Sequence, residues 1–271
     1  MFFTYFYVDK WVGVWQSKDM KILITGASSG IGRELAKLLA EKFDQMVLVG
    51  RNQSRLSALQ QEINGQYPDV NVTTVSLDLS VAEHCQQLHT MHPDVDLLIN
   101  NAGFGNCGEF ASDDLAKDLA MINTNVVALH ILTKLYLIDM QARNRGQILN
   151  VGSIAGFMPG PLMATYYATK NYVVRLSESI REELRRAKSK VKISVLCPGP
   201  VDTNFAKTAN VHFNFKGTSS AKVAQYVVKH LHQFYIIPSF KVRLARFGLG
   251  LLPSTWVARL VYNFQAKRIY D

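Results

Sequence analysis

The chain of 271 residues carries 30 Lys and Arg residues against 21 Asp and Glu residues, a formal net charge of +9 at neutral pH. This length suits one large α/β domain that buries its core without disulfide support, and three scattered cysteines favour a reducing, cytoplasmic setting. The positive charge suits a phosphorylated cofactor or an anionic membrane surface, and without a basic-aromatic groove motif it does not indicate nucleic acid.

The first 19 residues differ from the rest of the chain, because they are rich in aromatic residues and follow neither a helical nor an alternating pattern. They lack the basic start of a signal peptide, Asp9 and Lys10 interrupt the apolar run, and the stretch is too short to span a bilayer. We expect residues 1–19 to be an extension outside the fold, with a membrane-surface anchor as the alternative.

From Met20 onward, short β-branched runs alternate with longer amphipathic segments. This order is typical of a doubly wound parallel sheet with helices on both faces. The longest predicted helices are 113–140 and 164–188. The predicted strands are 21–25, 46–50, 70–77, 96–100, 147–152, 192–197 and 235–237. We expect residues 20–238 to form one α/β domain.

A glycine-rich turn, TGASSGIG at 25–32, joins the first predicted strand to the first helix. Gly26, Gly30 and Gly32 let the backbone approach a diphosphate, and the helix N-terminus supplies amide donors. The spacing differs from the G-x-G-x-x-G fingerprint, and a turn of this kind is also found as a simple tight connection. The motif alone therefore leaves dinucleotide binding open.

Tyr166 and Lys170 lie four residues apart in a predicted helix, which places them on one face about one turn from each other. An ammonium beside a phenol favours the phenolate, so we expect the pKa of Tyr166 to be lowered toward neutral pH. Such a tyrosine serves as a general acid or base. Tyr167 has no lysine four residues further on, and we interpret it as a packing residue.

The set of motifs resembles the short-chain dehydrogenase/reductase family from Met20 to about Pro238. The matching features are TGASSGIG at 25–32, Asp78, NNAG at 100–103, Asn125, Ser153, the pair of Tyr166 and Lys170, and PGPVDT at 198–203. The resemblance implies a Rossmann fold with the cofactor across the carboxyl ends of the strands. It also implies hydride transfer between a nicotinamide and a carbonyl or alcohol.

The resemblance assigns a role to each of four catalytic positions. Tyr166 would exchange a proton with the substrate oxygen, and Ser153 would hold that oxygen by a hydrogen bond. Lys170 would lower the tyrosine pKa and bind the nicotinamide ribose, while Asn125 would keep a water in the proton relay behind the lysine. Taken singly, Ser153 is also typical of a strand-end turn and Asn125 of a helix residue with a local backbone bond.

The resemblance also implies which residues bind the cofactor. Asp78 would contact the adenine, and Val201 and Thr203 would face the nicotinamide carboxamide. The whole predicted set is Gly26, Ser28, Ser29, Gly30, Ile31, Gly32, Arg51, Asn52, Asp78, Asn101, Gly103, Tyr166, Lys170, Pro198, Gly199, Val201 and Thr203. Ser80 would cap the next helix, which is compatible with the adenine contact of Asp78.

The sequence VLVGRNQSR at the end of the second predicted strand bears on the choice of cofactor. Gly50 and Arg51 stand where an Asp or Glu would bind the adenosine ribose 2′-hydroxyl. Arg51, with Asn52 or Arg55, can pair with a 2′-phosphate, so we expect NADP(H) to be preferred over NAD(H). The alternative is an arginine that only begins a solvated helix.

A group of His84, Cys85, His89 and His92 invites a metal-site interpretation. Its spacing matches no zinc pattern, and the segment is predicted to be a helix between the third and fourth strands. We expect a solvated or half-buried helix face and no metal, since the hydride transfer that the resemblance implies needs none.

Apolar residues surround the predicted reaction centre in the sequence. They are Ile154, Phe157, Met158, Met163, Phe205, Val211, Phe213 and Phe215. Because loops at the carboxyl ends of strands form the ligand wall, we expect a lipophilic ketone or aldehyde as substrate, with simple loop packing as the alternative. The alternative function is a non-catalytic dinucleotide-binding regulator or scaffold on the same fold.

Residues 239–271 form a basic segment with six Lys or Arg residues and one acidic residue. Trp256, Leu260, Val261 and Phe264 are expected on one face of an amphipathic helix. We expect this segment to pack on its own domain or on a partner subunit of a homo-oligomer. The alternative is weak contact with a membrane surface.

Overall fold

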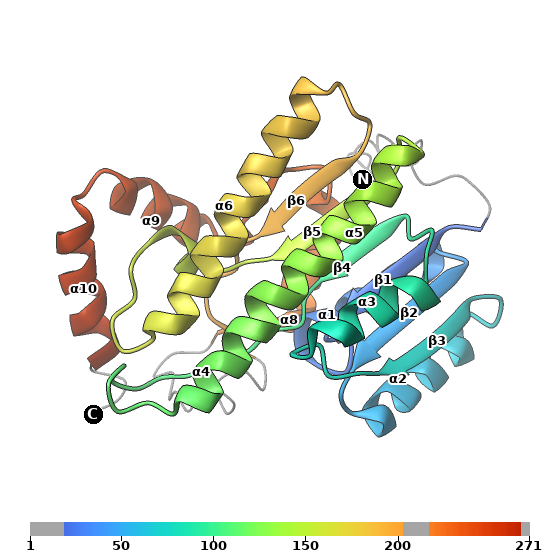
Figure 1. Cartoon of the computed structure of the whole chain (residues 1–271), viewed down its shortest axis with the longest axis horizontal. Helices are drawn as coiled ribbons and strands as arrows, with labels where there is room; N and C mark the ends of the chain where they lie inside the picture. The colour runs from blue at the N-terminus through green and yellow to red at the C-terminus, as the bar shows by residue number, and fades with distance from the viewer. Residues whose placement is uncertain (1–18, 203–216, 267–271) are drawn as a thin grey trace, which may run out of the picture.

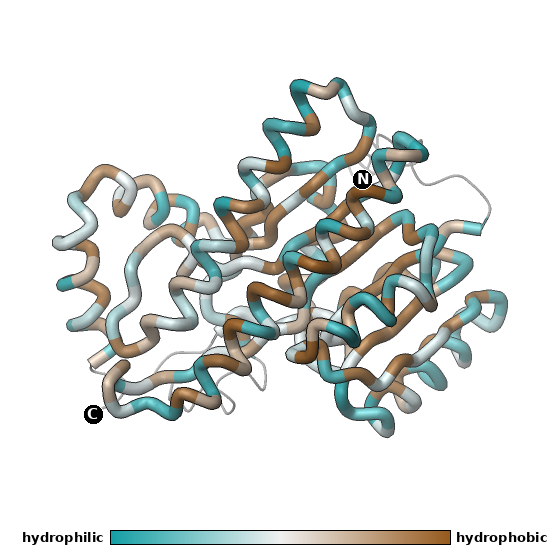
Figure 2. Tube along the Cα trace, viewed as in Figure 1, coloured by the Kyte–Doolittle hydropathy of each residue, from teal (hydrophilic) through white to brown (hydrophobic). Residues whose placement is uncertain are grey.

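The computed structural model describes residues 19–202 and 217–266 of the chain. The predicted extension up to residue 18, Thr203 and the predicted loop residues Phe205, Val211, Phe213 and Phe215 lie outside these ranges. The described part is a central sheet between layers of helices, with the last two helices together at one end of the molecule (Figure 1). Apolar residues concentrate along the strands and alternate with polar residues along the covering helices (Figure 2).

A seven-stranded parallel sheet has the order β3-β2-β1-β4-β5-β6-β9. Its strands are β1 (Lys21–Thr25), β2 (Gln45–Gly50), β3 (Asn71–Ser76), β4 (Leu97–Asn100), β5 (Gln147–Val151), β6 (Lys192–Leu196) and β9 (Tyr235–Ile236). All seven predicted strands are confirmed, and each predicted end lies within one residue of the observed end. The strand order reverses between β1 and β4, which creates the crevice where dinucleotides bind in such sheets.

Helices cover both faces of the sheet, so the predicted doubly wound architecture is confirmed. One face carries α1 (Gly30–Leu39), α2 (Gln53–Gln66) and α8 (Ser220–His230), whose apolar sides share a core cluster with β1 and β2. The other face carries α3 (Ala82–Met91), α5 (Leu129–Ala142) and α6 (Ala164–Arg186), which share a second cluster with the same sheet. A short parallel pair, β7 (Val201–Asp202) with β8 (Thr218–Ser219), stands apart from the main sheet.

The predicted helix 113–140 is not uniform. It consists of α4 (Leu115–Ile122), a π-helical segment η2 (Asn123–Ala128) and α5. A π-helical turn inserts an extra residue and shifts the face that the following residues present. By length and composition Leu115–Ala142 could cross a membrane, but Leu132, Tyr136 and Met140 pack in the core, as expected of a core helix.

The C-terminal region adds α9 (Phe240–Gly250) and α10 (Ser254–Ala266) at the end of the molecule beyond α6 (Figure 1). Val257 and Val261 of α10 pack against Met158, which follows the short helix η3 (Ile154–Phe157). Trp256, Leu260 and Phe264 are exposed. The predicted shared face was therefore wrong for Val261, because successive helical residues are separated by about 100°.

Candidate active site

A cavity of about 600 Å³ lies at the carboxyl ends of β1, β2, β4 and β5. It extends from the glycine-rich turn to α6, and it brings together most of the predicted site residues. Those on its wall are Gly26, Ser28, Ser29, Gly30, Ile31, Arg51, Asn52, Asp78, Asn101, Gly103, Ser153, Tyr166, Lys170, Pro198, Gly199 and Val201. Gly32 and Asn125 lie outside the wall, and Thr203 lies outside the described residues.

The turn after β1 needs glycine for steric reasons. Gly26 and Gly30 adopt φ values of +65° and +57°, a region that side chains disfavour. A Cβ atom on Gly26 would lie 2.8 Å from Asn101 Nδ2. A Cβ atom on Gly32 would lie 2.6 Å from the carbonyl oxygen of Gly26, so Gly32 lets the start of α1 pack on the turn without lining the cavity.

The turn and the start of α1 fit the diphosphate of a dinucleotide. Ser29 is the N-cap of α1 in extended conformation, and its side chain makes no capping hydrogen bond. Amide groups of a first helical turn lack intrahelical acceptors and bind anions, and the first turn of α1 carries no acidic residue. Asn101 fixes the turn, because its Nδ2 donates to the carbonyl oxygens of Thr25 at 3.0 Å and Gly26 at 3.1 Å.

Arginines line the end of the cavity beyond β2. Arg51 and Arg55 both face it, and neither forms an ion pair with a carboxylate of the described residues. The Asn52 side chain is committed to α2, since its Oδ1 accepts from the backbone N of Arg55 at 2.9 Å. This end therefore offers guanidinium groups, and no carboxylate follows β2.

Asp78 also lines this end of the cavity. Its Oδ1 accepts from the backbone N of Ser80 at 3.0 Å and from the Ser80 hydroxyl at 2.8 Å. Hydrogen bonds from Ser80 lower the pKa of Asp78, and the charge of Arg51 lowers it further. The predicted capping role of Ser80 was wrong: Val81 is the N-cap of α3, because Ser80 bonds to Asp78 instead.

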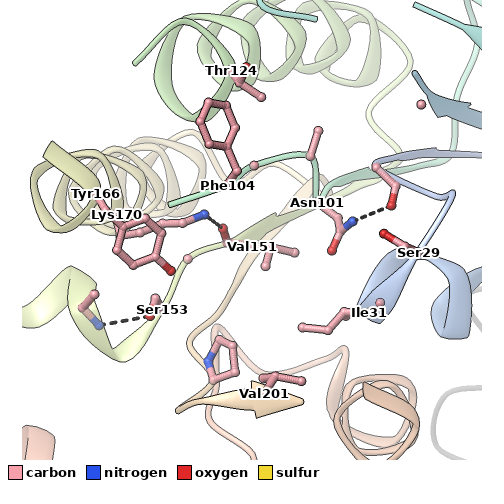
Figure 3. A pocket seen from close by; sticks show the side chains of 18 of the residues that line it. Ser29, Ile31, Asn101, Phe104, Thr124, Val151, Ser153, Tyr166, Lys170 and Val201 are labelled. Carbon is pink, nitrogen blue, oxygen red and sulfur yellow. Dashed lines mark hydrogen bonds between the residues drawn. The ribbon is translucent and has the colours of Figure 1, made fainter. Parts of the chain in front are cut away.

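Ser153, Tyr166 and Lys170 meet at the other end of the cavity. Tyr166 and Lys170 project from α6, and the Tyr166 hydroxyl points toward Ser153 (Figure 3). Lys170 Nζ donates to the carbonyl oxygen of Val151 at 2.9 Å and lies 5.9 Å from the centre of the Tyr166 ring. Ser153 Oγ accepts from the backbone N of Ala155 at 3.1 Å, which holds it at the start of η3.

Burial controls the protonation of both α6 residues. Burial raises the pKa of Tyr166 to about 12, although a hydrogen bond with Ser153 partly opposes the rise. Burial also lowers the pKa of Lys170 to about 8. The predicted lowering of the Tyr166 pKa was therefore wrong for this arrangement, because burial of the side chain disfavours the charged phenolate. At neutral pH Tyr166 is therefore a protonated phenol.

Asn125 lies behind the cavity wall, in the π-helical segment η2. Its side chain is buried, with Oδ1 accepting from the backbone N of Phe104 at 3.0 Å and Nδ2 donating to the Phe104 carbonyl at 2.8 Å. Gly103 lies between Asn125 and Lys170, and a Cβ atom there would be 2.8 Å from Asn125 Oδ1 and 3.5 Å from Lys170 Nζ. The relay role of Asn125 stays a prediction. In the structure, its side chain holds the loop after β4 in place through these hydrogen bonds.

The sequence interpretation missed part of the wall near Tyr166. Tyr167, interpreted as packing only, lines the cavity, and so does Gln265 of α10. Gln265 is buried, and its Nε2 donates to the Tyr167 hydroxyl at 2.9 Å. These two residues are 98 positions apart, so no local pattern could have joined them. Phe104 and Thr124 are further wall residues that no motif indicated.

The expected apolar residues divide between the cavity and the core. Ile154 and Met163 line the cavity. Phe157 packs beside Tyr235 at 5.9 Å between ring centres, and Met158 packs under α10. The alternative interpretation of simple packing therefore holds for Phe157 and Met158.

The residues of α3 that invited a metal interpretation have separate surroundings. His84 Nδ1 lies 2.8 Å from the carbonyl oxygen of Asp78, and His89 Nε2 lies 2.6 Å from Asp139 Oδ2. Cys85 is buried, which raises the pKa of its thiol to about 11. Within residues 19–202 and 217–266, no three His, Cys, Asp or Glu side chains converge on a common point.

The cavity joins a glycine-rich turn, at the switch point of a doubly wound sheet, to a serine, a tyrosine and a lysine. This combination defines a class of dinucleotide-dependent oxidoreductases. The profile of the short chain dehydrogenase family matches residues 20–213, and the chain belongs to this family. It is a short-chain dehydrogenase/reductase that acts on CH–OH or C=O groups with NAD(P).

Related proteins support this assignment. Human dehydrogenase/reductase SDR family member 11 is 32% identical over 202 residues, which is 72% of this chain and 78% of the relative. A short-chain dehydrogenase from Sphingobium yanoikuyae in complex with NADPH has a TM-score of 0.76 and 26% identity, covering 85% of this chain and 94% of its own.

Two further solved structures bear on cofactor and substrate. A short-chain dehydrogenase/reductase from Burkholderia phymatum in complex with NAD has a TM-score of 0.74 and 25% identity, over 84% of this chain and 92% of its own. A bulky-bulky ketone specific alcohol dehydrogenase from Comamonas testosteroni has a TM-score of 0.73 and 25% identity, over 85% of this chain and 93% of its own. Members of similar structure thus hold either NADPH or NAD.

Proposed function

We propose that this protein is an NADP(H)-preferring carbonyl reductase that reduces a lipophilic ketone or aldehyde to the alcohol. The observation that carries the proposal is the meeting of Ser153, Tyr166 and Lys170 in one cavity with the glycine-rich turn. A protonated Tyr166 favours reduction, which consumes a proton at the substrate oxygen.

The chain's own residues supply the proton and stabilise the developing charge. NADPH held in this cavity would supply a hydride to the carbonyl carbon. The Ser153 hydroxyl donates a hydrogen bond to the carbonyl oxygen, and Tyr166 transfers its proton to that oxygen as negative charge develops there. Lys170 carries a positive charge below its pKa of about 8, and this charge stabilises the phenolate that Tyr166 becomes.

The preference for NADP(H) is supported by the charges beyond β2. Arg51 and Arg55 line the cavity where an adenosine 2′-phosphate would lie, and guanidinium groups bind phosphate through charge-assisted hydrogen bonds. The family relative that holds NADPH is consistent with this preference, while the one that holds NAD makes cofactor selectivity the first property to measure.

The substrate class is supported by the wall around Tyr166. Phe104, Ile154 and Met163 present apolar surface there, while Tyr167 and Gln265 add polar groups at its edge. A binding site of this composition favours a lipophilic carbonyl compound. The similar ketone-specific dehydrogenase from Comamonas testosteroni supports the same class.

We further propose that the protein works in the cytoplasm as a homo-oligomer. None of its three cysteines forms a disulfide, which suits a reducing compartment. Phe110, Leu115 and Leu119 on and beside α4 expose apolar side chains that a second subunit would cover. Analytical ultracentrifugation of the purified protein measures the oligomeric state directly.

The test follows NADPH oxidation at 340 nm with a panel of aliphatic, aromatic and polycyclic ketones and aldehydes. We expect turnover with at least one lipophilic member, and a loss of about 10³-fold in kcat for Tyr166→Phe. Tyr167→Phe is the matched control and should stay within about tenfold of the wild type. NADPH binding without turnover across the panel would instead support the regulator or scaffold.

A further inference from the structure

Helix α9 presents an apolar stripe that the described fold leaves uncovered. The α9 stripe consists of Phe240, Leu244, Phe247 and Leu251, which are 73%, 62%, 70% and 72% exposed. Their spacing places all four on one narrow face of the helix. No residue of α9 is buried, so the helix does not use this face to stabilise its own domain.

Basic residues flank the α9 stripe. Lys241 and Arg243 are exposed on either side of it. The segment 239–266 contains four Lys or Arg residues and no Asp or Glu. An exposed apolar face bordered by cations is the composition of helices that lie in the interface of an anionic bilayer.

A second cavity, of about 560 Å³, opens beside the stripe between α8, β9 and α9. Phe247 and Leu251 of the stripe form part of its wall, and so do Arg243 and Arg246. The Arg246 guanidinium is held in place by stacking on Tyr235, at 3.7 Å from the ring centre. Among the described residues, no Asp or Glu lines this cavity. Glu178, which accepts a hydrogen bond from the Tyr235 hydroxyl, is paired with Arg175. The cavity thus combines an apolar surface, which can contact acyl chains, with two guanidinium groups that can bind a phosphate.

We propose that the α9 stripe is a membrane-surface contact for anionic phospholipid. The stripe enters the acyl region, Lys241 and Arg243 lie at headgroup level, and the second cavity receives a headgroup phosphate. Charge selects this occupant over a second copy of the chain, because an isologous contact would place two basic surfaces of the same sign against each other. The contact would hold the enzyme where lipophilic carbonyl compounds partition, a consequence that rests on the proposed function.

Cosedimentation of the full chain with vesicles of phosphatidylcholine alone and of phosphatidylcholine with 30 mol% phosphatidylglycerol tests the contact. We expect binding to the anionic vesicles that weakens at high salt, and little binding to the neutral ones. The double variant Phe247→Ser, Leu251→Ser should bind at least about tenfold more weakly. Lys241→Glu with Arg243→Glu should weaken binding by about fivefold or more for each charge.

Matched controls place similar changes on α3, α4 and α5. Met91→Ser on α3 with Ile138→Ser on α5 removes two other exposed apolar side chains, and Lys117→Glu with Lys134→Glu makes the same change in net charge. Both controls should bind vesicles like the wild type, and circular dichroism should show all variants folded. Turnover with a water-soluble carbonyl should be unchanged in the α9 variants, so a failure of the proposed activity is distinguishable from a failure of binding.

Several outcomes would overturn the proposal. The first is that the wild-type protein does not bind anionic vesicles. The second is that the α9 variants and their controls lose vesicle binding equally. The third is that the Phe247→Ser, Leu251→Ser variant binds vesicles as well as the wild type. A wild-type oligomer that this variant converts to monomer, without vesicle binding, would show instead that the stripe joins two copies of the chain.

Discussion

The two ends of the main cavity are built in different ways. The diphosphate part of the cofactor end is made mainly of backbone: residues 25–32 form the turn and the start of α1, and the Asn101 side chain holds the turn in place. The substrate end is made of side chains from separate elements, with Phe104 after β4, Tyr167 on α6 and Gln265 on α10. Backbone geometry leaves a local signature in the sequence, whereas a wall assembled from distant helices leaves none.

Ser153 lies where the two ends meet, and among the variants compared below its substitution has the largest expected effect. Ser153→Ala should lower kcat by about 10²–10³-fold, because the hydroxyl stabilises charge that develops only in the transition state. The NADPH dissociation constant, from quenching of protein fluorescence, should stay unchanged. A comparable loss of NADPH affinity would mean that Ser153 belongs to the cofactor end instead.

Arg51→Ala tests the cofactor end alone. We expect KM for NADPH to rise by about 10–100-fold, since a charge-assisted phosphate contact is lost, while KM for NADH changes little. Steady-state kinetics with both cofactors and one ketone measure this ratio. Equal losses for the two cofactors would contradict a 2′-phosphate contact.

The pH dependence of the free energy of unfolding tests the protonation of Lys170. Its folded-state pKa of about 8 lies below the value of an unfolded lysine, so between these values the unfolded state binds more protons and stability rises with pH. The wild type should therefore gain about 1–2 kcal/mol in free energy of unfolding from pH 7 to 9.5 relative to Lys170→Met. Urea titrations measure it, with Lys117→Met on exposed α4 as the control. A constant difference between wild type and Lys170→Met would show that Lys170 stays charged across this range.

Gln265→Leu tests the substrate end alone and should have the smallest effect. Loss of the hydrogen bond to Tyr167 should raise KM for a lipophilic ketone by about threefold to tenfold and leave KM for NADPH unchanged. Gln141→Leu, on the exposed surface of α5, is the matched control. An altered KM for NADPH in Gln265→Leu would show that α10 also shapes the cofactor end.

The sequence predicts the sheet well because each strand is a short apolar run between turn residues, and central strands covered on both faces are apolar throughout. The glycine turn and the Tyr166 and Lys170 pair are recognisable because each lies within one turn or one helix. The π-helical segment at Asn123–Ala128 was not predicted, since the apolar pattern of Leu115–Ala142 reads as one helix.

Two further properties depend on the folded environment. The pKa of Tyr166 follows from burial, which spacing along a helix does not reveal. The place of Ser80 was mispredicted because the competition between capping α3 and bonding to Asp78 is decided by the three-dimensional path of the loop. Sequence reasoning was thus dependable for motifs within one element and weak where two elements compete.

The bond between Gln265 and Tyr167 has an evolutionary consequence. The family profile matches residues 20–213, so this glutamine lies in a tail outside the part of the chain that carries the shared chemistry. We therefore expect mutations in this C-terminal segment to change substrate selectivity without changing hydride transfer. A chimaera that carries the C-terminal segment of a related enzyme should acquire the substrate selectivity of that enzyme and keep its own rate of hydride transfer.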